Sequence, residues 1–280
     1  MTGVVQYSSN DIANWAQFSG DYNPIHFDAA ASKRFGHASV VVHGMIAVLQ
    51  ALESVLGGLR EIPGSQEWTT VTQRLRIPIY PGEQLKLGPG ARGPQRLALR
   101  SEASVKVQVD VETSDTYETE VPALSCTATD ETKQQLGEIS VDPAALATGR
   151  SALHDSFGWL RTDITFFQAS AFAHFMRVHI STLERWAQRS LGISQPTLGI
   201  TDNSTYTVVQ TTHRAIVHRS WLDDDAGSLE NGLQLRFAPT ALTTLAGGGC
   251  ASVCEIEVRA DRQYPMFAKI GLLLTRNTKG

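Results

Sequence analysis

Cysteine is scarce in this sequence, which has only Cys126, Cys250 and Cys254 among 280 residues. An odd, sparse set without histidine-rich spacing offers no zinc site and no disulfide framework, and it is typical of a reducing compartment. An excess of positive charge is also missing, because 24 Lys and Arg face 28 Asp and Glu for a formal net charge of -4. We therefore expect no nucleic-acid partner, since such a partner requires cations against its phosphates.

Long hydrophobic runs are absent as well. The longest apolar run lies near residues 47–52 and is too short to span a bilayer, and residues 1–10 lack the charged and apolar regions of a signal peptide. We expect a cytoplasmic protein that makes no use of a membrane. A chain of 280 residues with 42% hydrophobic and 19% charged residues has the length of about two globular domains.

One long, largely apolar helix is predicted over about residues 43–56. Apolar side chains recur there in steps of three and four, and the pair Gly57-Gly58 is expected to end the helix. Period-two alternation follows at residues 105–111, where four valines alternate with polar residues and share one face of a strand. Further strands of this half are predicted over residues 68–80, 85–87 and 119–129.

The second half repeats this order of elements. The segment 142–149 is rich in Ala, Pro and Gly and is interpreted as a linker, and a second helix is predicted from Phe172 to near Gly192. Its predicted strands are residues 205–221, 229–237, 251–259 and 266–275. We therefore expect two similar units in tandem, residues 1–145 and residues 150–280.

The predicted architecture follows from the first helix, because a helix that is apolar on most sides must be buried on most sides. Each unit should curl an antiparallel sheet around its own helix. Pairing the two sheets edge to edge would cover strand edges that otherwise invite aggregation. The expected class is α+β, with a pseudo-dimer inside one chain, and a homodimer of such chains stays open.

The densest group of polar residues, segment 18–28, precedes the first long helix. Pro24 interrupts regular structure there, so Asp21, Asn23 and His26 should share one loop. A carboxylate near an imidazole can divide proton donation and proton abstraction between the two groups. The alternative is a turn whose side chains only satisfy local backbone amides, with His26 as an incidental surface residue.

Two further segments favour chemistry at this loop. His43-Gly44 begins the predicted helix, and a glycine there lets backbone N–H groups approach a ligand oxygen closely, as in an oxyanion hole. An extended run over residues 77–85 stops at the turn Pro81-Gly82. Segments 21–26, 42–45 and 78–83 together resemble the MaoC-like, R-specific enoyl-thioester hydratase and dehydratase family, over about residues 8–132.

This resemblance implies a hot-dog fold, so the whole chain would be a tandem double hot-dog that acts on acyl thioesters carried by CoA or an acyl carrier protein. Asp21 and His26 match the catalytic pair of the family, and Asn23 matches the loop residue that orients them. Gly44 matches the backbone oxyanion donor, and we group the adjacent His43 with it as oxyanion or substrate-binding. No metal and no cofactor is expected.

The chain departs from the family pattern in two places. Some members have a serine eight positions after the glycine, where this chain has Leu52. The second half lacks the Asp-x-Asn-Pro-x-His run, and its segment 165–170 faintly resembles the loop that leads into the helix of hot-dog thioesterases, with Gln168 in place of their acidic residue. We expect this half to shape the acyl tunnel.

The predicted activity is addition or removal of water at an R-configured 3-hydroxyacyl thioester. His26 would remove the α-proton, Asp21 would handle the β-hydroxyl or water, and the Gly44 N–H would stabilise the thioester oxygen. Thioester hydrolysis by the C-terminal unit and a non-catalytic acyl-binding role are the alternatives. The sequence leaves open the handle, the acyl length, the pathway and the direction.

Overall fold

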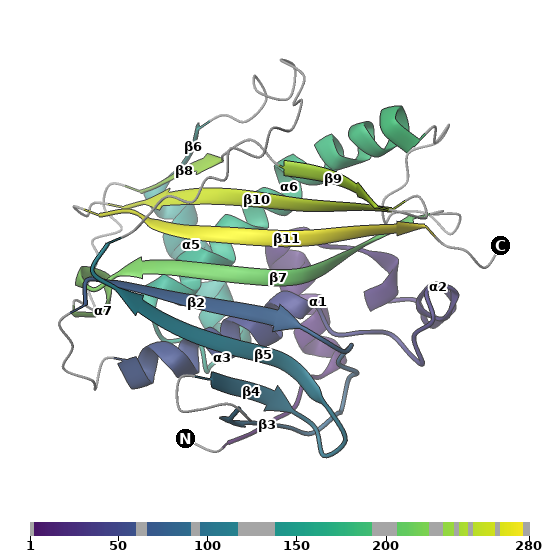
Figure 1. Ribbon diagram of the computed structural model, residues 1–280, viewed down its shortest axis with the longest axis horizontal. Helices are drawn as coiled ribbons and strands as arrows, with labels where there is room; N and C mark the ends of the chain where they lie inside the picture. Colours follow the sequence, from purple (N-terminus) through teal and green to yellow (C-terminus); the bar gives the residue numbers. More distant parts are fainter. Residues whose placement is uncertain are drawn as a thin grey trace.

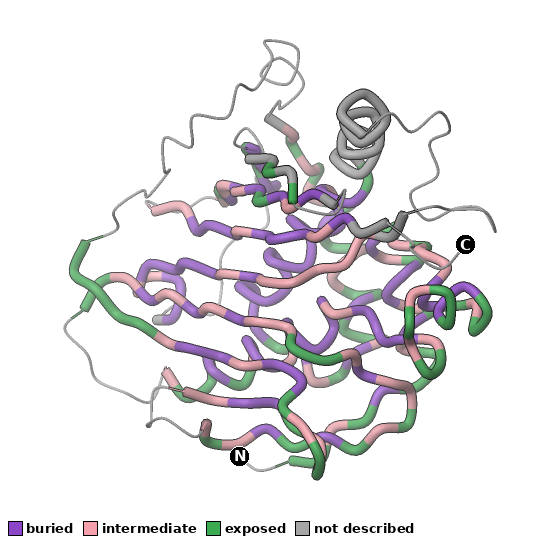
Figure 2. The backbone as a smooth tube through the Cα atoms, turned by 45° about the vertical axis from the view of Figure 1, so that its right-hand side comes forward, coloured by how far each residue is buried: buried purple, intermediate pink, exposed green. Residues whose placement is uncertain are grey.

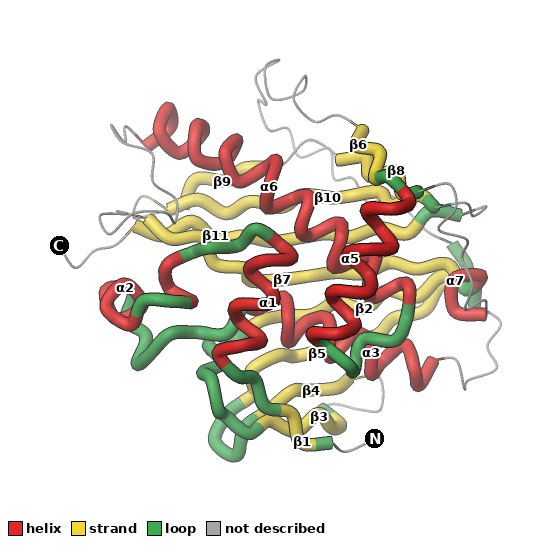
Figure 3. Tube along the Cα trace, turned by 180° about the vertical axis from the view of Figure 1, so that it is seen from behind, coloured by secondary structure: helices red, strands yellow, loops and turns green. Residues whose placement is uncertain are grey.

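A computed structural model describes residues 3–59, 66–90, 96–116, 138–191, 206–223, 232–237, 241–245, 249–260 and 264–276. Its strands form one antiparallel sheet in the order β1-β3-β4-β5-β2-β7-β11-β10-β8-β6, with β9 paired to β10. Helices α1, α3, α5 and α6 lie against one face of this sheet (Figures 1 and 3). The α+β class predicted from the sequence is thus confirmed.

The first half contains the short helices and the loop that precede its central helix, and then four strands. Its elements are β1 (Val4–Val5), α1 (Ser9–Ser19), the 3-10 turn η1 (Pro24–His26), α2 (Ala29–Arg34), α3 (Gly44–Leu59), β2 (Trp68–Leu75), β3 (Leu85–Pro89), β4 (Arg96–Arg100) and β5 (Val105–Ser114).

The second half has a longer central helix and most of the long strands. Its elements are β6 (Glu138–Val141), α5 (Pro143–Ser156), α6 (Asp163–Leu191), β7 (Tyr206–His218), α7 (Ser220–Asp223), β8 (Leu233–Phe237), β9 (Ala241–Leu245), β10 (Gly249–Arg259) and β11 (Met266–Arg276).

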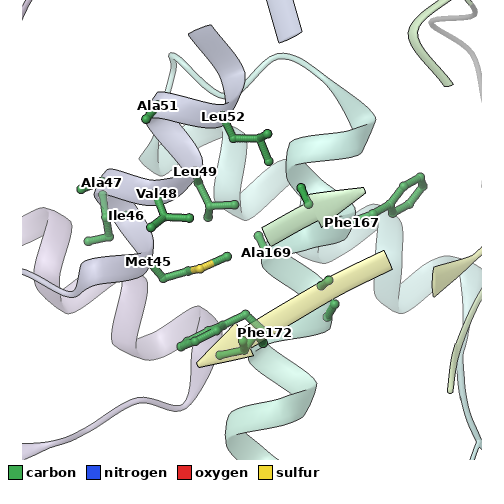
Figure 4. Packing of buried hydrophobic residues seen from close by; sticks show 14 of the residues in the cluster. Met45, Ile46, Ala47, Val48, Leu49, Ala51, Leu52, Phe167, Ala169 and Phe172 are labelled. Carbon is green, nitrogen blue, oxygen red and sulfur yellow. The ribbon is translucent and has the colours of Figure 1, made fainter. Parts of the chain in front are cut away.

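The two halves meet where β2 pairs antiparallel with β7, in a register that runs from Trp68 opposite His218 to Arg74 opposite Thr212. This junction makes the sheet continuous and covers one edge of each half, as the edge-to-edge arrangement predicts. Beneath it, α3 packs on α6, and Met45 and Leu49 of α3 lie near Phe172 of α6 (Figure 4). Buried positions follow the central strands and both long helices (Figure 2).

Several element boundaries differ from the prediction. Helix α3 continues through Gly57 and Gly58, and β2 ends at Leu75 because Pro78 and Pro81 disfavour further pairing. Strand β7, predicted over residues 205–221, ends at His218, and the short helix α7 follows it. The strand predicted over 119–129 and residues 229–231 of another lie outside the described residues.

The predicted linker over residues 142–149 is wrong, because this segment belongs to helix α5. Asp142 caps that helix by accepting hydrogen bonds from the backbone N–H groups of Ala144 and Ala145. The gap left between the two predicted units therefore lies inside a helix, and the division at 145 and 150 stays a proposal. In the described part of the chain, no helix is both long enough and apolar enough to cross a membrane.

The second central helix begins at Asp163, nine residues before the predicted start at Phe172. Its first turns have no exposed side, since Ile164, Phe166 and Phe167 are each at most 1% exposed and the intervening Thr165 is fully buried. Burial on every side removes the polar face that a helical pattern needs, so the sequence shows no periodicity there.

Candidate active site

The predicted polar loop forms between α1 and α3. Ser8 begins α1 with a capping box in which its hydroxyl accepts from the Asp11 backbone N–H and the Asp11 carboxylate accepts from the Ser8 backbone N–H. Gly20 ends the helix at φ 77°, a left-handed conformation that favours glycine. The chain then turns sharply through η1, which places Asp21 and His26 at the same cavity.

His26 is 8% exposed and its tautomer follows from one contact. Nδ1 lies 2.8 Å from the carbonyl oxygen of Val41, and since a carbonyl only accepts, Nδ1 carries the proton. Nε2 is left as the basic nitrogen. Burial lowers the pKa of His26, an effect that the charge of Asp21 partly opposes, so the ring stays neutral near pH 7.

His43 lies directly behind this ring. The two imidazoles stack with centroids 3.7 Å apart, and His43 Nε2 donates to the backbone oxygen of Asp21 at 2.9 Å. Burial, with a further contribution from the neighbouring His26, lowers the pKa of His43 to about 3. His43 is therefore neutral near pH 7 and supports the His26 ring by stacking on it. The described residues that line the cavity include Gly44 but not His43. The substrate-binding role expected for both residues therefore fits Gly44 better than His43.

Asn23 connects the loop to the second half of the chain. Its Oδ1 accepts from the Ile25 backbone N–H at 3.3 Å, which shapes the turn. Its Nδ2 donates to the carbonyl oxygen of Val208 on β7 at 3.1 Å. The side chain predicted to orient the loop thus fastens it to a strand of the other unit.

A cavity of about 360 Å³ lies in front of the loop. Asp21, Asn23 and His26 line it together with Gly44 and neighbouring residues of α3 and the 75–79 segment. A side chain at Gly44 would place its Cβ 2.6 Å from Leu75 Cδ2, so any larger residue there would require the Leu75 side chain to move. The fold brings together at this cavity the predicted residues Asp21, Asn23, His26 and Gly44. Leu52 is buried in the hydrophobic core.

The second half supplies part of the cavity wall, as its expected role in shaping an acyl tunnel requires, but the sequence did not identify which of its residues do so. This part of the wall consists of Phe172 and Met176 of α6, Val208, Val209, Gln210 and Thr211 of β7, and Leu272 of β11. Most of these side chains are apolar, as an acyl chain would require. No local signal in the sequence links these positions to the polar loop.

Asp21, His26 and His43 form the one described group of three residues that could hold a metal ion, with ligand atoms within 4.8 Å of one another. The Asp21 carboxylate Oδ2 lies 3.9 Å from His43 Nε2. An ion that used this nitrogen would break its hydrogen bond to the Asp21 carbonyl. The arrangement as it stands suits proton transfer between a carboxylate and the His26 imidazole.

The segment 165–170 lies in the first turns of α6 and does not form a loop. Gln168 is fully buried, and its Nε2 lies 3.3 Å from both the Phe267 carbonyl oxygen and the Met266 sulfur. The amide nitrogen is therefore engaged inside the core, and Gln168 is not among the described residues that line the cavity. No observation there favours a separate hydrolytic site.

Comparison with known proteins supports the class of protein that this fold and site suggest. Residues 3–88 match the family model of the MaoC like domain. A stretch of 79 residues is 30% identical to the mitochondrial 3-hydroxyacyl-(acyl-carrier-protein) dehydratase of Arabidopsis thaliana, covering 28% of this chain and 45% of that protein. The chain thus matches less than half the length of this curated relative.

Several similar solved structures span nearly the whole chain. One is a MaoC domain protein dehydratase from Chloroflexus aurantiacus, with a TM-score of 0.50 and 7% identity over 99% of this chain and 95% of that one. Another is a conserved Mycobacterium tuberculosis protein described as having a double hotdog fold, with a TM-score of 0.50 and 9% identity over 98% and 96%. Residues 3–88 therefore match a MaoC like domain, and the fold is the predicted double hot-dog.

Proposed function

We propose that this protein is an (R)-specific enoyl-thioester hydratase or 3-hydroxyacyl-thioester dehydratase. The observation that carries the proposal is the Asp21 carboxylate within 4.8 Å of a ring nitrogen of a buried, neutral His26, with both residues at the wall of a largely apolar cavity. This pair can take a proton from the α-carbon of an acyl chain and deliver one to the hydroxyl group on the β-carbon. The match of residues 3–88 to the MaoC like domain supports the same chemistry.

In dehydration, His26 Nε2 takes the α-proton and the C–H electron pair moves toward the thioester oxygen. The Gly44 N–H, at the start of α3, lies in the first turn, where N–H groups have no intrahelical acceptor, and it stabilises the charge on that oxygen. The pair then returns to form the α,β double bond as the β-hydroxyl leaves. The proton that His26 took from the α-carbon passes through the Asp21 carboxylate to this hydroxyl, which departs as water, so both residues regain their starting states, and hydration runs the same steps in reverse.

The substrate is proposed to be an acyl thioester carried by CoA or by an acyl carrier protein. The Arabidopsis relative acts, by its name, on the carrier-protein form. Phe172 and Met176 offer an apolar surface for the acyl chain. The chain is proposed to work as a pseudo-dimer in which only the first unit has the catalytic loop.

Incubation with a panel of (R)-3-hydroxyacyl and trans-2-enoyl thioesters on both handles tests the proposal. Mass spectrometry should show gain or loss of one water, and a free-thiol assay should stay silent because the thioester survives. Release of thiol without any change in hydration would replace the proposal with hydrolysis. Binding of acyl thioesters without turnover of either kind would favour an acyl-binding protein.

A further inference from the structure

Strand β7 changes which face its residues present to the helices. Toward its C-terminal end, the odd-numbered residues face the helices: Ala215 and Val217 belong to the buried core, and His213 is fully buried. Strict alternation would point Thr211 to the core and turn Gln210 away from it. A register shift opposite Gly271–Leu272 adds one residue to β7 at this point.

The pairing with β11 shows the result of this bulge. Ile270, Leu272 and Leu274 of β11 all belong to the core, and they lie opposite His213, Gln210 and Val208 in turn. Residues directly opposite each other in a sheet share a face. The bulge therefore turns Gln210 toward the helices and into the cavity, and bulges commonly re-aim a side chain beside an active site.

The Gln210 amide reaches the start of α3. Its Oε1 lies 3.5 Å from the position that a Cβ on Gly44 would occupy, and its Nε2 lies 3.5 Å from the sulfur of Met45. A thioether sulfur is a weak acceptor, so the two amide N–H donors are without a strong partner among the described residues. Since Oε1 is the amide atom nearer Gly44, a half turn of the amide group about its last side-chain bond is needed to bring Nε2 beside the N–H groups of the helix start. This half-buried amide can then donate to an oxygen in the largely apolar cavity.

The surroundings also hold Gln210 in place relative to the polar loop. Val208, two residues before it on the same strand, accepts the hydrogen bond from Asn23. Thr211, the residue after it, donates through its hydroxyl to the Gly271 carbonyl oxygen at 3.2 Å. The glutamine thus stands on a strand that is tied on one side to the catalytic loop and on the other to β11.

We propose that Gln210 is a catalytic residue that donates an amide N–H to the thioester oxygen, together with the Gly44 N–H. The oxyanion hole would then combine one donor from each half of the chain. The inference rests on the proposed function. As His26 removes the α-proton, the electron pair that moves to the thioester oxygen meets two fixed donors, and no covalent bond to Gln210 forms.

The main test compares Gln210→Met with wild type on a substrate from the thioester panel. Methionine keeps the length of the side chain and removes both donors, so kcat should fall about a hundredfold while KM and the melting temperature change little. Gln234→Met is the matched control, because Gln234 is an exposed glutamine on β8 of the same half. Its kcat should equal that of wild type.

A second variant, Gln210→Glu, has the same shape and gives a signature that a purely structural role would not produce. The new carboxyl can donate only when protonated, so kcat should be lowest at high pH and should recover as the pH falls, a trend absent from wild type and from Gln210→Met. This variant also serves if Gln210→Met does not fold.

The inference is overturned if Gln210→Met keeps kcat within about threefold of wild type, or if KM alone rises, since that loss would be one of ground-state binding. Asp21→Asn, measured in parallel, separates this failure from a failure of the proposed function. An active wild type with an inactive Asp21→Asn and an active Gln210→Met removes Gln210 alone. A wild type inactive on the whole panel removes the proposed function and this inference with it.

Discussion

At the start of α3 the chain has a glycine, a cavity and a loop with a carboxylate and an imidazole. At the start of α6 the corresponding helix end is closed by protein groups. The Thr162 backbone N–H and hydroxyl donate to Glu53 Oε2 at 3.2 and 2.9 Å, and Asp163 forms an ion pair with Arg150. The same helix-and-sheet unit therefore directs its helix N-terminus to a cavity in one half and to an internal carboxylate in the other.

The comparison shows that two units with the same fold can differ in the functional groups that they present. Glu53 belongs to α3, so the first half supplies the group that closes the second helix. Val208 and Gln210 belong to β7, so the second half supplies part of the wall around the first helix. Each half contributes groups to the other, and of the two helix starts the one of α3 lines the cavity.

The largest expected effect comes from the loop itself. Asp21→Asn and His26→Ala should each lower kcat by about a hundredfold to ten-thousandfold, because each removes a placed acid or base. Gln168→Met, in the corresponding helix of the second half, should leave kcat within about threefold of wild type. Steady-state kinetics on one thioester substrate measures all three variants. Equal losses in the two halves would show that the comparison is wrong.

Gly44→Val should lower kcat by about two to three orders of magnitude. A Cβ at this position meets Leu75 Cδ2 at 2.6 Å, and the branched side chain also fills the approach to the N–H groups of α3. The acid and base remain in place, so the titration of His26 followed by NMR should be preserved. Normal kcat in a folded Gly44→Val variant would place the oxyanion donor elsewhere.

Each half also has a buried histidine whose pKa is lowered by burial to about 3, His43 in the first and His213 in the second. The unfolded chain binds a proton at each position below about pH 6.5, whereas the folded chain does not until near pH 3. Stability is therefore fully present above pH 6.5 and is lost as the pH falls toward 3. Each histidine should contribute a slope of up to about 1.4 kcal/mol per pH unit to the free energy of unfolding.

Urea denaturation at several pH values between 7 and 4.5 measures this slope. His213→Gln should reduce the pH dependence of the free energy of unfolding by the equivalent of up to one bound proton, because the titrating group is removed. Glutamine can still donate to Gln73 Oε1, the present partner of His213, so the fold should be preserved. His154→Gln is the control, because His154 is exposed on α5. An unchanged slope in His213→Gln would mean that this imidazole gains its proton while the protein is folded.

The smallest effect is expected for Glu53→Gln. The amide keeps one acceptor for Thr162 but removes the negative charge at the start of α6, so the free energy of unfolding should fall by about 1 kcal/mol. Activity should be unchanged. Thermal unfolding of this variant beside Glu102→Gln, an exposed residue outside any helix, checks the value. A loss of kcat would connect the closed helix end to the chemistry.

The sequence predicted the first helix and the polar loop well because both carry local signals. The apolar steps of residues 43–56 and the Asp21 to His26 spacing need no distant partner to be read. Helix α5 was within reach too, since Asp142 followed by Pro143 is a helix-start signal that the Ala- and Gly-rich composition obscured.

Other features could not be predicted because they depend on tertiary contacts. The start of α6 is buried on all sides and so lacks periodicity. Gln210 faces the cavity only because of a one-residue bulge against β11, and two successive threonines after it suit an uninterrupted strand equally well. His43 could be placed next to Gly44 in the chain, but its stacking behind His26 emerges only in the folded loop.

The continuous β2–β7 junction also frees this chain from a constraint of symmetry. In a two-fold dimer of identical subunits, every residue occurs twice, so a change that suits one site alters the other as well. Here the strand that carries Gln210 and the strand that pairs with it are encoded separately. Covalent linkage thus allows the two halves to differ in sequence. One half has the Asp21–His26 loop, and the other has side chains that a symmetric dimer would have to carry in both subunits.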